Sequence, residues 1–309
     1  MAYEYVYGPV ASRRLGRSLG VSPIKDNLCN LNCVYCQLGK IQATPNHRFS
    51  YFPKEAILSE LKTVLKKKYD YDVISIVGDG EPTLHHDLGE MIRFIKANSS
   101  KPVSLITNGR LFDDLALLEE IAACDIVLPT LDAYDEASYK RINRPVGNET
   151  FAYFLENLQL FSTRFKNQIW LEIMLVSGYN DSEEALKKFK EILATISYDR
   201  LYLNTVVRPP KSQRAQAVSK KTMKHFSETL GGIPLDYLSK ETYLSIEEDT
   251  YQALLSLLKR HPLHQYEIQT FLKHREEAAD EIFKKLDDDD KIMIKPYGPY
   301  DMYTYNTPD

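Results

Sequence analysis

Hydrophobic and polar residues alternate along most of the chain with two different periods. Short apolar runs of the kind found in buried strands occupy residues 72–78, 103–107, 125–131, 170–176 and 200–207. Between them lie longer segments with apolar residues on one helical face, at 53–68, 87–98, 113–123, 150–165 and 181–195. Strands that alternate with helices predict right-handed βαβ units and a parallel sheet.

A further strand near residues 19–24 would bring the number of βα units to about six. Six units favour a partial barrel over a closed eightfold one, and an open doubly wound sheet is the alternative. We therefore expect an α/β fold, a partial (β/α)6 barrel, over residues 1–210.

The pattern changes after Pro209 and Pro210. A helix at 219–230 and a Gly-Gly-Ile-Pro break predict a connecting helix and linker over 211–245. The remaining residues, 246–309, predict a small separate domain. Its expected elements are three helices followed by a hairpin, which is the winged-helix arrangement, at 249–259, 266–271, 276–286, 291–295 and 302–305.

Composition adds little beyond the class of protein. A chain of 309 residues with 43% hydrophobic residues, 27% charged residues and a net charge of −4 is typical of a soluble protein with one large and one small domain. No global basic excess indicates nucleic-acid binding. The sequence shows neither a secretion signal nor eighteen consecutive apolar residues, so we expect no membrane association and a cytoplasmic protein.

Three of the four cysteines lie within eight positions, as Cys29, Cys33 and Cys36 with C-x3-C-x2-C spacing. Clustered cysteines in a cytoplasmic chain of this size indicate a metal site rather than disulfides. Zinc sites usually have two C-x2-C pairs, although His47 could complete one here. Three thiolates would leave one iron of an iron–sulfur cluster open, as a catalytic metal requires. Cys124 ends an apolar helix and is expected in the core.

This triplet, with Tyr35 directly before its last cysteine, resembles the motif of the radical S-adenosylmethionine (SAM) superfamily. The resemblance runs from Tyr7 to Pro210 and looks closest to wyosine-type tRNA-modifying enzymes and their uncharacterised relatives. The cyclase of molybdenum-cofactor synthesis is similar at greater distance. The resemblance implies a [4Fe–4S] cluster whose open iron binds SAM. An electron donor such as ferredoxin or flavodoxin would reduce the cluster, and a 5′-deoxyadenosyl radical would abstract hydrogen from the substrate.

The resemblance also implies which residues bind SAM. Gly78-Asp79-Gly80-Glu81 is similar to the family's Gly-Gly-Glu-type motif, with Asp79 in place of the first glycine, and there a glycine lets the backbone approach the ligand. The residues that would lie against SAM are Tyr35, Gly80, Glu81, Asn108, Thr130, Asp132 and Val206, and Glu172 and Asn204 would face the same mouth. The alternative for several of them is ordinary turn and helix-capping chemistry.

Six arginines are expected near this mouth, because they flank the predicted strand ends: Arg13, Arg14, Arg17, Arg141, Arg144 and Arg208. Guanidinium groups form bidentate hydrogen bonds to phosphate and carboxylate. We therefore expect an anionic substrate, with tRNA as the first candidate, although each arginine alone is more often a solvated surface charge. Some of them could instead hold the carboxylate of SAM.

The expected winged helix is acidic where DNA-binding versions are basic. Its third helix carries Glu276, Glu277, Asp280 and Glu281, and four aspartates follow. Phosphate would be repelled, so we expect this domain to contact a protein partner or to cover the barrel. Two alternative functions to RNA modification are therefore consistent with the sequence. One is radical modification of a peptide or protein, and the other is a non-catalytic iron–sulfur sensor with a winged-helix output.

Overall fold

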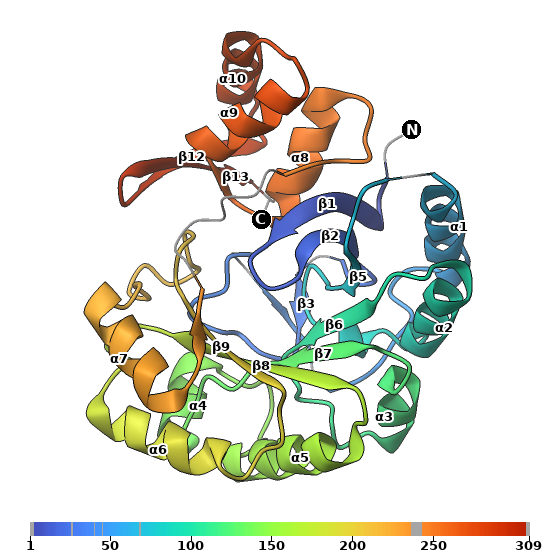
Figure 1. Cartoon of the computed structure of the whole chain (residues 1–309). Coiled ribbons are helices and arrows are strands. Elements are labelled where there is room, and N and C mark those ends of the chain that lie inside the picture. Colours follow the sequence, from blue (N-terminus) through green and yellow to red (C-terminus); the bar gives the residue numbers. More distant parts are fainter. Residues whose placement is uncertain are drawn as a thin grey trace.

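The computed structural model describes residues 3–25, 27–39, 41–44, 46–67, 69–235 and 243–306. Its main element is an eight-stranded sheet that curves into an open barrel (Figure 1), with the order β1-β2-β5-β6-β7-β8-β9-β10. The strands are β1 (Val6–Ser12), β2 (Gly16–Val21), β5 (Val73–Ile76), β6 (Val103–Thr107), β7 (Ile126–Pro129), β8 (Gln168–Leu175), β9 (Arg200–Thr205) and β10 (Ile233–Pro234). All neighbours from β2 to β10 pair in parallel, as the alternating pattern predicts.

Helices cover the outer face of this sheet (Figure 1). They are α1 (Lys54–Leu65), α2 (Leu88–Asn98), α3 (Leu115–Ile121), α4 (Glu136–Ile142), α5 (Phe151–Arg164), α6 (Glu183–Leu193) and α7 (Lys220–Leu230). Their apolar faces and the outer faces of the strands form one large core, which also contains Cys124. That cysteine is fully buried, as expected. A small parallel pair, β3 (Leu28–Cys29) and β4 (Gln42–Ala43), brackets the cysteine loop.

Three elements of the barrel were not predicted. One is the two-residue strand β10, which lies in the predicted Gly-Gly-Ile-Pro break. Strand β1 pairs antiparallel with β2 and contains an irregularity between Tyr7 and Val10, where Gly8 and Pro9 interrupt the apolar run. Helix α4 has only two large apolar residues, Tyr139 and Ile142, too few for a periodic pattern, and a capping box between Asp135 and Ser138 begins it. The first parallel strand also lies a few residues earlier than the predicted 19–24.

The C-terminal residues form a second, smaller body. Its order is α8 (Thr250–Arg260), β11 (Leu263–His264), α9 (Gln265–His274), α10 (Ala279–Asp288), β12 (Ile292–Tyr297) and β13 (Tyr300–Tyr305), with a sheet ordered β11-β13-β12. This helix–strand–helix–helix–hairpin order includes the predicted helices and hairpin, and β11 is additional. Part of the predicted linker 211–245, residues 236–242, lies outside the described residues.

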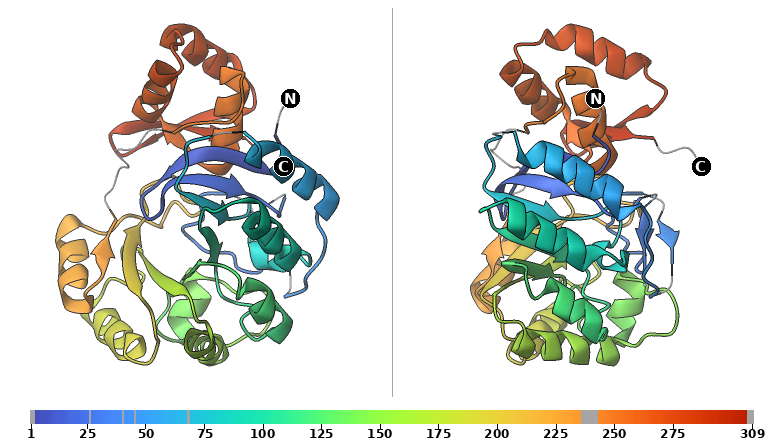
Figure 2. Two further views of the ribbon diagram at one scale, coloured as in Figure 1. Left: turned by 45° about the vertical axis from the view of Figure 1, so that its right-hand side comes forward. Right: turned by 90° about the vertical axis from the view of Figure 1, so that its right-hand side faces the viewer.

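This C-terminal body packs on the barrel at β1 and β2, as both views of Figure 2 show. Tyr7 and Val10 of β1 belong to its hydrophobic core, together with Leu254 and Leu258 of α8. Helix α7 and strand β10, in contrast, belong to the barrel, because β10 pairs with β9. The two bodies therefore meet over the N-terminal hairpin.

Among the described residues, no helix has both the length and the apolar character that crossing a membrane requires.

Candidate functional site

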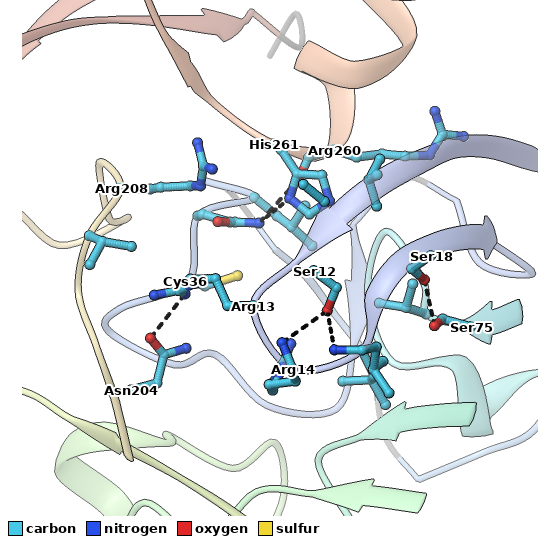
Figure 3. Close-up of a pocket in the computed structure, with 18 of the residues that line it drawn as sticks. Ser12, Arg13, Arg14, Ser18, Cys36, Ser75, Asn204, Arg208, Arg260 and His261 are labelled. Carbon is cyan, nitrogen blue, oxygen red and sulfur yellow. Dashed lines mark hydrogen bonds between the residues drawn. The ribbon is translucent and has the colours of Figure 1, made fainter. Parts of the chain in front are cut away.

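A cavity of about 350 Å³ lies inside the barrel, between the cysteine loop and the C-terminal body (Figure 3). This volume is within the usual range of small-molecule sites. The barrel contributes its floor, including Ser18, Ser75, Glu172 and Asn204. The cysteine loop contributes one wall and the C-terminal body another, with Tyr35, Cys36 and Gln37 on the first and Arg260, His261, His264 and Glu267 on the second. We call this cavity the chamber.

The cysteine loop is fixed from both sides by backbone hydrogen bonds. On one side, the Val34 N–H donates to the Ile142 carbonyl at 2.9 Å and the Asn32 N–H to the Asn143 carbonyl at 2.9 Å. On the other side, the Lys211 N–H donates to the Cys36 carbonyl at 2.8 Å. The loop that carries all three clustered cysteines is therefore held by α4 and by the segment after β9.

Nitrogen donors point at two of the three sulfur atoms. The Leu31 N–H donates to Cys29 Sγ at 3.4 Å, and the Asn108 side-chain amide to the same sulfur at 3.7 Å. The Asn143 amide donates to Cys33 Sγ at 3.6 Å. Burial raises the pKa of Cys29 to about 12 and raises the pKa of Cys33 and Cys36 as well. Partly buried sulfurs that are supplied with donors, as those of Cys29 and Cys33 are, suit thiolates that lose their protons to a metal.

The donor set fits a cluster better than a single ion. A zinc ion about 2.3 Å from each sulfur would need its ligands close together. Within the described part of the chain, no three His, Cys, Asp or Glu side chains are grouped closely enough to bind one metal ion. His47, the candidate fourth zinc ligand, packs its ring against Phe49 at 4.2 Å. Three cysteines on one loop are instead the kind of ligand set that holds a [4Fe–4S] cluster through thiolates.

Gly80 lets the segment that follows β5 pack closely against the cysteine loop. Its φ of +145° is a conformation that side chains disfavour, and a Cβ there would lie 1.8 Å from the Leu28 carbonyl oxygen. The next residue continues this contact, because the Glu81 N–H donates to the same carbonyl at 2.9 Å. Gly80 therefore serves the packing of the loop against the barrel.

Glu81 is buried and holds neighbouring loops together. Its carboxylate accepts hydrogen bonds from the Thr83 N–H and hydroxyl, the Thr107 hydroxyl at 2.7 Å and the Asn108 N–H at 2.7 Å. Burial raises its pKa, and these donors oppose that effect. Because Glu81 positions Asn108, whose side-chain amide donates to Cys29 Sγ, it affects Cys29 indirectly.

Asp132 has a similar role beneath Cys33. It accepts hydrogen bonds from the Tyr35 hydroxyl, the Asn143 amide at 3.1 Å and the Met174 N–H at 2.8 Å. Its side chain is buried, and it lies outside the lining of the chamber. Tyr35 lines the chamber, so its hydroxyl connects the chamber wall to Asp132.

The seven residues expected against SAM are therefore not equivalent. Tyr35 and Val206 line the chamber, and the Val206 carbonyl accepts a hydrogen bond from the Tyr297 hydroxyl of β12 at 2.9 Å. The other five lie behind the wall: Gly80, Glu81, Asn108, Thr130 and Asp132. Thr130 forms a backbone bridge with Glu172. Four of these five, all but Thr130, support the cysteine loop or hold its supports in place.

The six arginines expected near the mouth lie in different places. Arg13, Arg14 and Arg208 line the chamber. Arg17 does not, because it pairs with Asp70 and Asp72 before β5, at the opposite end of the strands. Arg141 and Arg144 are exposed outside the chamber. Flanking a strand end does not fix where a long side chain points.

Charges inside the chamber are largely matched. Arg14 pairs with Glu172, and Arg208 pairs with Glu267 of α9 at 3.1 Å. Arg13 donates to the Asn204 side-chain oxygen at 3.0 Å (Figure 3). Four guanidinium groups and three carboxylates line the chamber: Arg13, Arg14, Arg208, Arg260, Asp79, Glu172 and Glu267. The chamber is thus weakly cationic.

No local pattern in the sequence indicates the residues that α8, β11 and α9 contribute to the chamber. Arg260 approaches Asp79, and His261 accepts a hydrogen bond at Nδ1 from Gln37, the neighbour of Cys36, at 3.0 Å in the tautomer that places the proton on Nε2. Burial and four surrounding arginines lower the pKa of His261 to about 3. A neutral imidazole therefore faces the chamber beside the cysteine loop. Only tertiary packing brings residues so distant in sequence together.

Three buried serines form the floor. The Ser18 hydroxyl donates to Ser75 Oγ at 2.6 Å, and the Ser104 hydroxyl donates to the same atom at 2.8 Å. Ser18 and Ser75 line the chamber (Figure 3). Small hydroxyl side chains on three adjacent strands leave room inside the barrel and keep its floor polar.

Comparisons with known proteins agree with this geometry. A family model described as "Radical SAM superfamily" matches residues 26–189. A protein of Helicobacter pylori J99 described as "UPF0026 protein" is 33% identical over 96% of this chain and 96% of its own length. A Brachyspira hyodysenteriae protein described as "GTPase Obg" is 33% identical over 93% of this chain, and the chain spans 43% of that longer protein.

The fold also resembles solved structures. A radical SAM methyltransferase from Sphaerobacter thermophilus superimposes with a TM-score of 0.55 at 15% identity, covering 70% of this chain and 65% of that one. At this identity the likeness supports the fold alone. The cysteine loop, the barrel and the family match coincide in the same part of the chain.

Proposed function

The chain belongs to the radical SAM superfamily, and we propose that it cleaves SAM reductively and abstracts hydrogen from an anionic substrate bound in the chamber. Members of this superfamily use a [4Fe–4S] cluster and SAM. The observation that carries the proposal is the position of Cys36, which lines the chamber while Cys29 and Cys33 lie behind it with amide donors on their sulfurs.

Each part of the site has a role under this proposal. Cys29, Cys33 and Cys36 would hold the cluster, which when bound supplies the single electron that SAM cleavage requires. Asn108 and Asn143 orient two of the thiolates. The remaining walls exclude water, so that a reactive species formed in the chamber meets the substrate rather than solvent.

The support for an anionic substrate is the charge of the chamber. Its guanidinium groups outnumber its carboxylates, and Arg13 comes from the β1–β2 turn, far in sequence from the cysteine loop. The volume of about 350 Å³ suits a small molecule or a single nucleotide extruded from RNA. The resemblance to wyosine-type enzymes makes a tRNA nucleotide the first candidate to test.

We further propose that the C-terminal body is a winged-helix-like cover rather than a nucleic-acid reader. Its helix α10 carries Asp280 and Glu281 near its start and is followed by Asp289 and Asp290. Acidic residues at that position oppose phosphate binding. In contrast, α8 and α9 place Arg260, His261 and Glu267 on the chamber wall, which is the role of a cover.

The proposal is tested with protein reconstituted anaerobically with iron and sulfide. Given SAM and dithionite, the unchanged protein should form 5′-deoxyadenosine, and Cys33→Ala should form none. Cys124→Ala is the matched control, because it removes a buried cysteine far from the loop, and it should retain activity. A protein with a full cluster that forms no 5′-deoxyadenosine, with or without added tRNA, would favour the iron–sulfur sensor.

A further inference from the structure

The two arginines that lie outside the chamber belong to a separate surface beside the cysteine loop. Arg141 is in α4, Arg144 is the second residue after this helix ends, and both are exposed. The Asn32 N–H of the cysteine loop donates to the carbonyls of Asn143 and Arg144, at 2.9 and 3.2 Å. These arginines therefore sit on a segment that is hydrogen-bonded to the cysteine loop itself.

Two further cations lie on the opposite flank of the loop, in residues 211–217. The Lys211 N–H binds the Cys36 carbonyl, and the Lys211 ammonium donates to Asn32 Oδ1 at 2.5 Å. The Ser212 N–H donates to the Val34 carbonyl at 3.1 Å. Arg214, in the same segment, is exposed.

The two flanks are joined into one surface by the turn after β8. Arg141 donates to the Gly178 carbonyl and stacks on the Tyr179 ring at 4.4 Å. Val176 of the same turn forms a bridge with Ala217. Beneath them a small core packs the three segments against the cysteine loop, through Val34, Ile142, Val176, Val206 and Ala215. We call the exposed surface above it the basic patch, consisting of Arg141, Arg144, Lys211 and Arg214.

The charge of the basic patch differs from that of the whole chain. The segments 141–144, 176–181 and 211–217 contain these four cations and one carboxylate, Asp181, whose oxygen accepts the Gly178 N–H at 2.8 Å. The residues of the cysteine loop from 29 to 38 carry no formal charge. A concentrated positive surface on a chain with a net charge of −4 would attract an acidic partner specifically.

We propose that the basic patch is the docking surface for a small acidic one-electron carrier protein of the ferredoxin type. The inference rests on the proposed function, which needs one electron delivered to the cluster. In that step the reduced carrier loses one electron and the cluster gains it, with no proton or other group transferred. The patch is suited to this because Lys211 is one hydrogen bond from the Cys36 backbone, and Asn143, the residue before Arg144, donates its amide to Cys33 Sγ.

An RNA partner is the competing occupant of a cationic surface, and the geometry disfavours it. None of the four cations lines the chamber, so RNA bound there would not thereby place a base within it. An electron carrier needs only to approach the outer side of the cysteine loop. The basic patch covers that side.

The test compares two charge-reversed proteins, each reconstituted with its cluster. Arg144→Glu/Arg214→Glu changes the basic patch at two exposed positions for which the structure shows no side-chain bond. Lys62→Glu/Arg164→Glu is the control, with the same change in net charge on the outer helices α1 and α5. Stopped-flow absorbance measures cluster reduction by a reduced acidic ferredoxin and, separately, by dithionite, a small reductant that needs no docking surface.

We expect the patch variant to be reduced by ferredoxin at least tenfold more slowly than the unchanged protein at low salt, and the control variant within twofold. The rate for the unchanged protein should fall with ionic strength, since steering is screened by salt. Reduction by dithionite should be the same in all three proteins. Equal ferredoxin rates in the patch variant and the unchanged protein, including no reduction of either, would overturn the proposal. So would a patch variant that loses affinity for tRNA while its ferredoxin rate is unchanged.

Failure of the docking proposal is distinguishable from failure of the proposed function. Dithionite-driven formation of 5′-deoxyadenosine does not involve the basic patch. If that product forms and the rate of cluster reduction by ferredoxin is unaffected by the charge reversal, only the docking proposal is wrong. If no product forms with dithionite, the proposed function itself fails.

Discussion

Asp79, in the Gly78-Asp79-Gly80-Glu81 segment after β5, forms an ion pair with Arg260 at the end of α8, with 3.7 Å between Oδ2 and Nε. This pair crosses the junction between the barrel and the C-terminal body. Arg260 is buried, and its guanidinium also stacks on the Tyr7 ring of β1 at 4.3 Å and donates to the Glu4 carbonyl at 2.8 Å. One side chain thus contacts the motif, the first strand and the N-terminal segment together. The C-terminal body is built into the site and not merely attached to the barrel.

Replacing Arg260 should therefore destabilise the whole protein. Burial raises the pKa of Asp79 and the Arg260 charge opposes that effect, so Arg260→Gln leaves a partly buried carboxylate without its counter-charge. We expect the free energy of unfolding to fall by about 2–4 kcal/mol, measured by urea denaturation. Asp79→Asn combined with Arg260→Gln should cost less than the two single changes added together.

The neighbouring Lys259 provides the control for this change. It is exposed and approaches the Tyr305 ring at 5.2 Å, and its charge affects the pKa of Asp79 less than that of Arg260 does, so Lys259→Gln should change stability by less than about 0.5 kcal/mol. Additive costs in the double variant would show that Asp79 and Arg260 do not interact. In that case the packing of Arg260 on Tyr7 would account for its effect.

A comparison of Gly80 with Gly39 separates the effect of a steric clash from the effect of a positive φ. Both have positive φ, +145° and +76°, but a Cβ at Gly80 would meet the Leu28 carbonyl, whereas nothing lies within 4 Å of a Cβ at Gly39. Gly39→Ala should cost about 1–2 kcal/mol and retain iron. Gly80→Ala should move the cysteine loop and retain less than half of the iron after reconstitution, by colorimetric iron analysis. Equal iron in both variants would contradict the packing role of Gly80.

Much of the barrel could be predicted, because local patterns determine it. The strands β5 to β9 and six of the helices follow from apolar periodicity and capping residues, and the cysteine spacing alone indicated the cluster. Strand β1 was missed because Gly8 and Pro9 interrupt its pattern. Helix α4 was missed because its only large apolar residues are Tyr139 and Ile142, too few to show a period, whereas the equally short α3 is rich in leucine.

The chamber could not be predicted in the same way, because its walls come from distant segments. Nothing local in the sequence indicates that His261 meets Gln37 or that Arg208 meets Glu267. The sequence likewise does not indicate in which direction a side chain points. Arg13 and Arg17 are four residues apart, yet one lines the chamber and the other pairs with Asp70 and Asp72 at the far end of the strands. Such outcomes depend on tertiary packing, which periodicity does not encode.

The amide of Asn143 should affect the reduction potential of the cluster. A hydrogen bond to Cys33 Sγ stabilises the more negative, reduced state, so its loss should make reduction harder. A bond worth about 0.5–1.5 kcal/mol corresponds to about 20–60 mV for one electron. Asn143→Ala should lower the midpoint potential by that amount in a redox titration followed by electron paramagnetic resonance. Asn157→Ala, on the exposed side of α5, is the control and should leave the potential unchanged.

His261 should make stability depend on pH in a defined window. Burial, and the charges of Arg208, Arg260, Arg14 and Arg13, lower its pKa from 6.5 to about 3 in the folded protein. Below pH 6.5 the unfolded chain takes up a proton that the folded protein does not, so stability falls as the pH drops toward 3. The slope for one such group is at most about 1.4 kcal/mol per pH unit.

The comparison that isolates this effect uses His261→Gln, whose amide can still bond to Gln37 but does not titrate. Between pH 6.5 and 5 the free energy of unfolding of the unchanged, cluster-free protein should fall by about 1–2 kcal/mol more than that of the variant. His225→Gln, which changes an exposed histidine of α7, should retain the steep dependence of the unchanged protein. Parallel curves for the unchanged protein and His261→Gln would mean that His261 accepts a proton in the folded state. The imidazole would then add a positive charge to the chamber in acid, which the surrounding arginines should prevent.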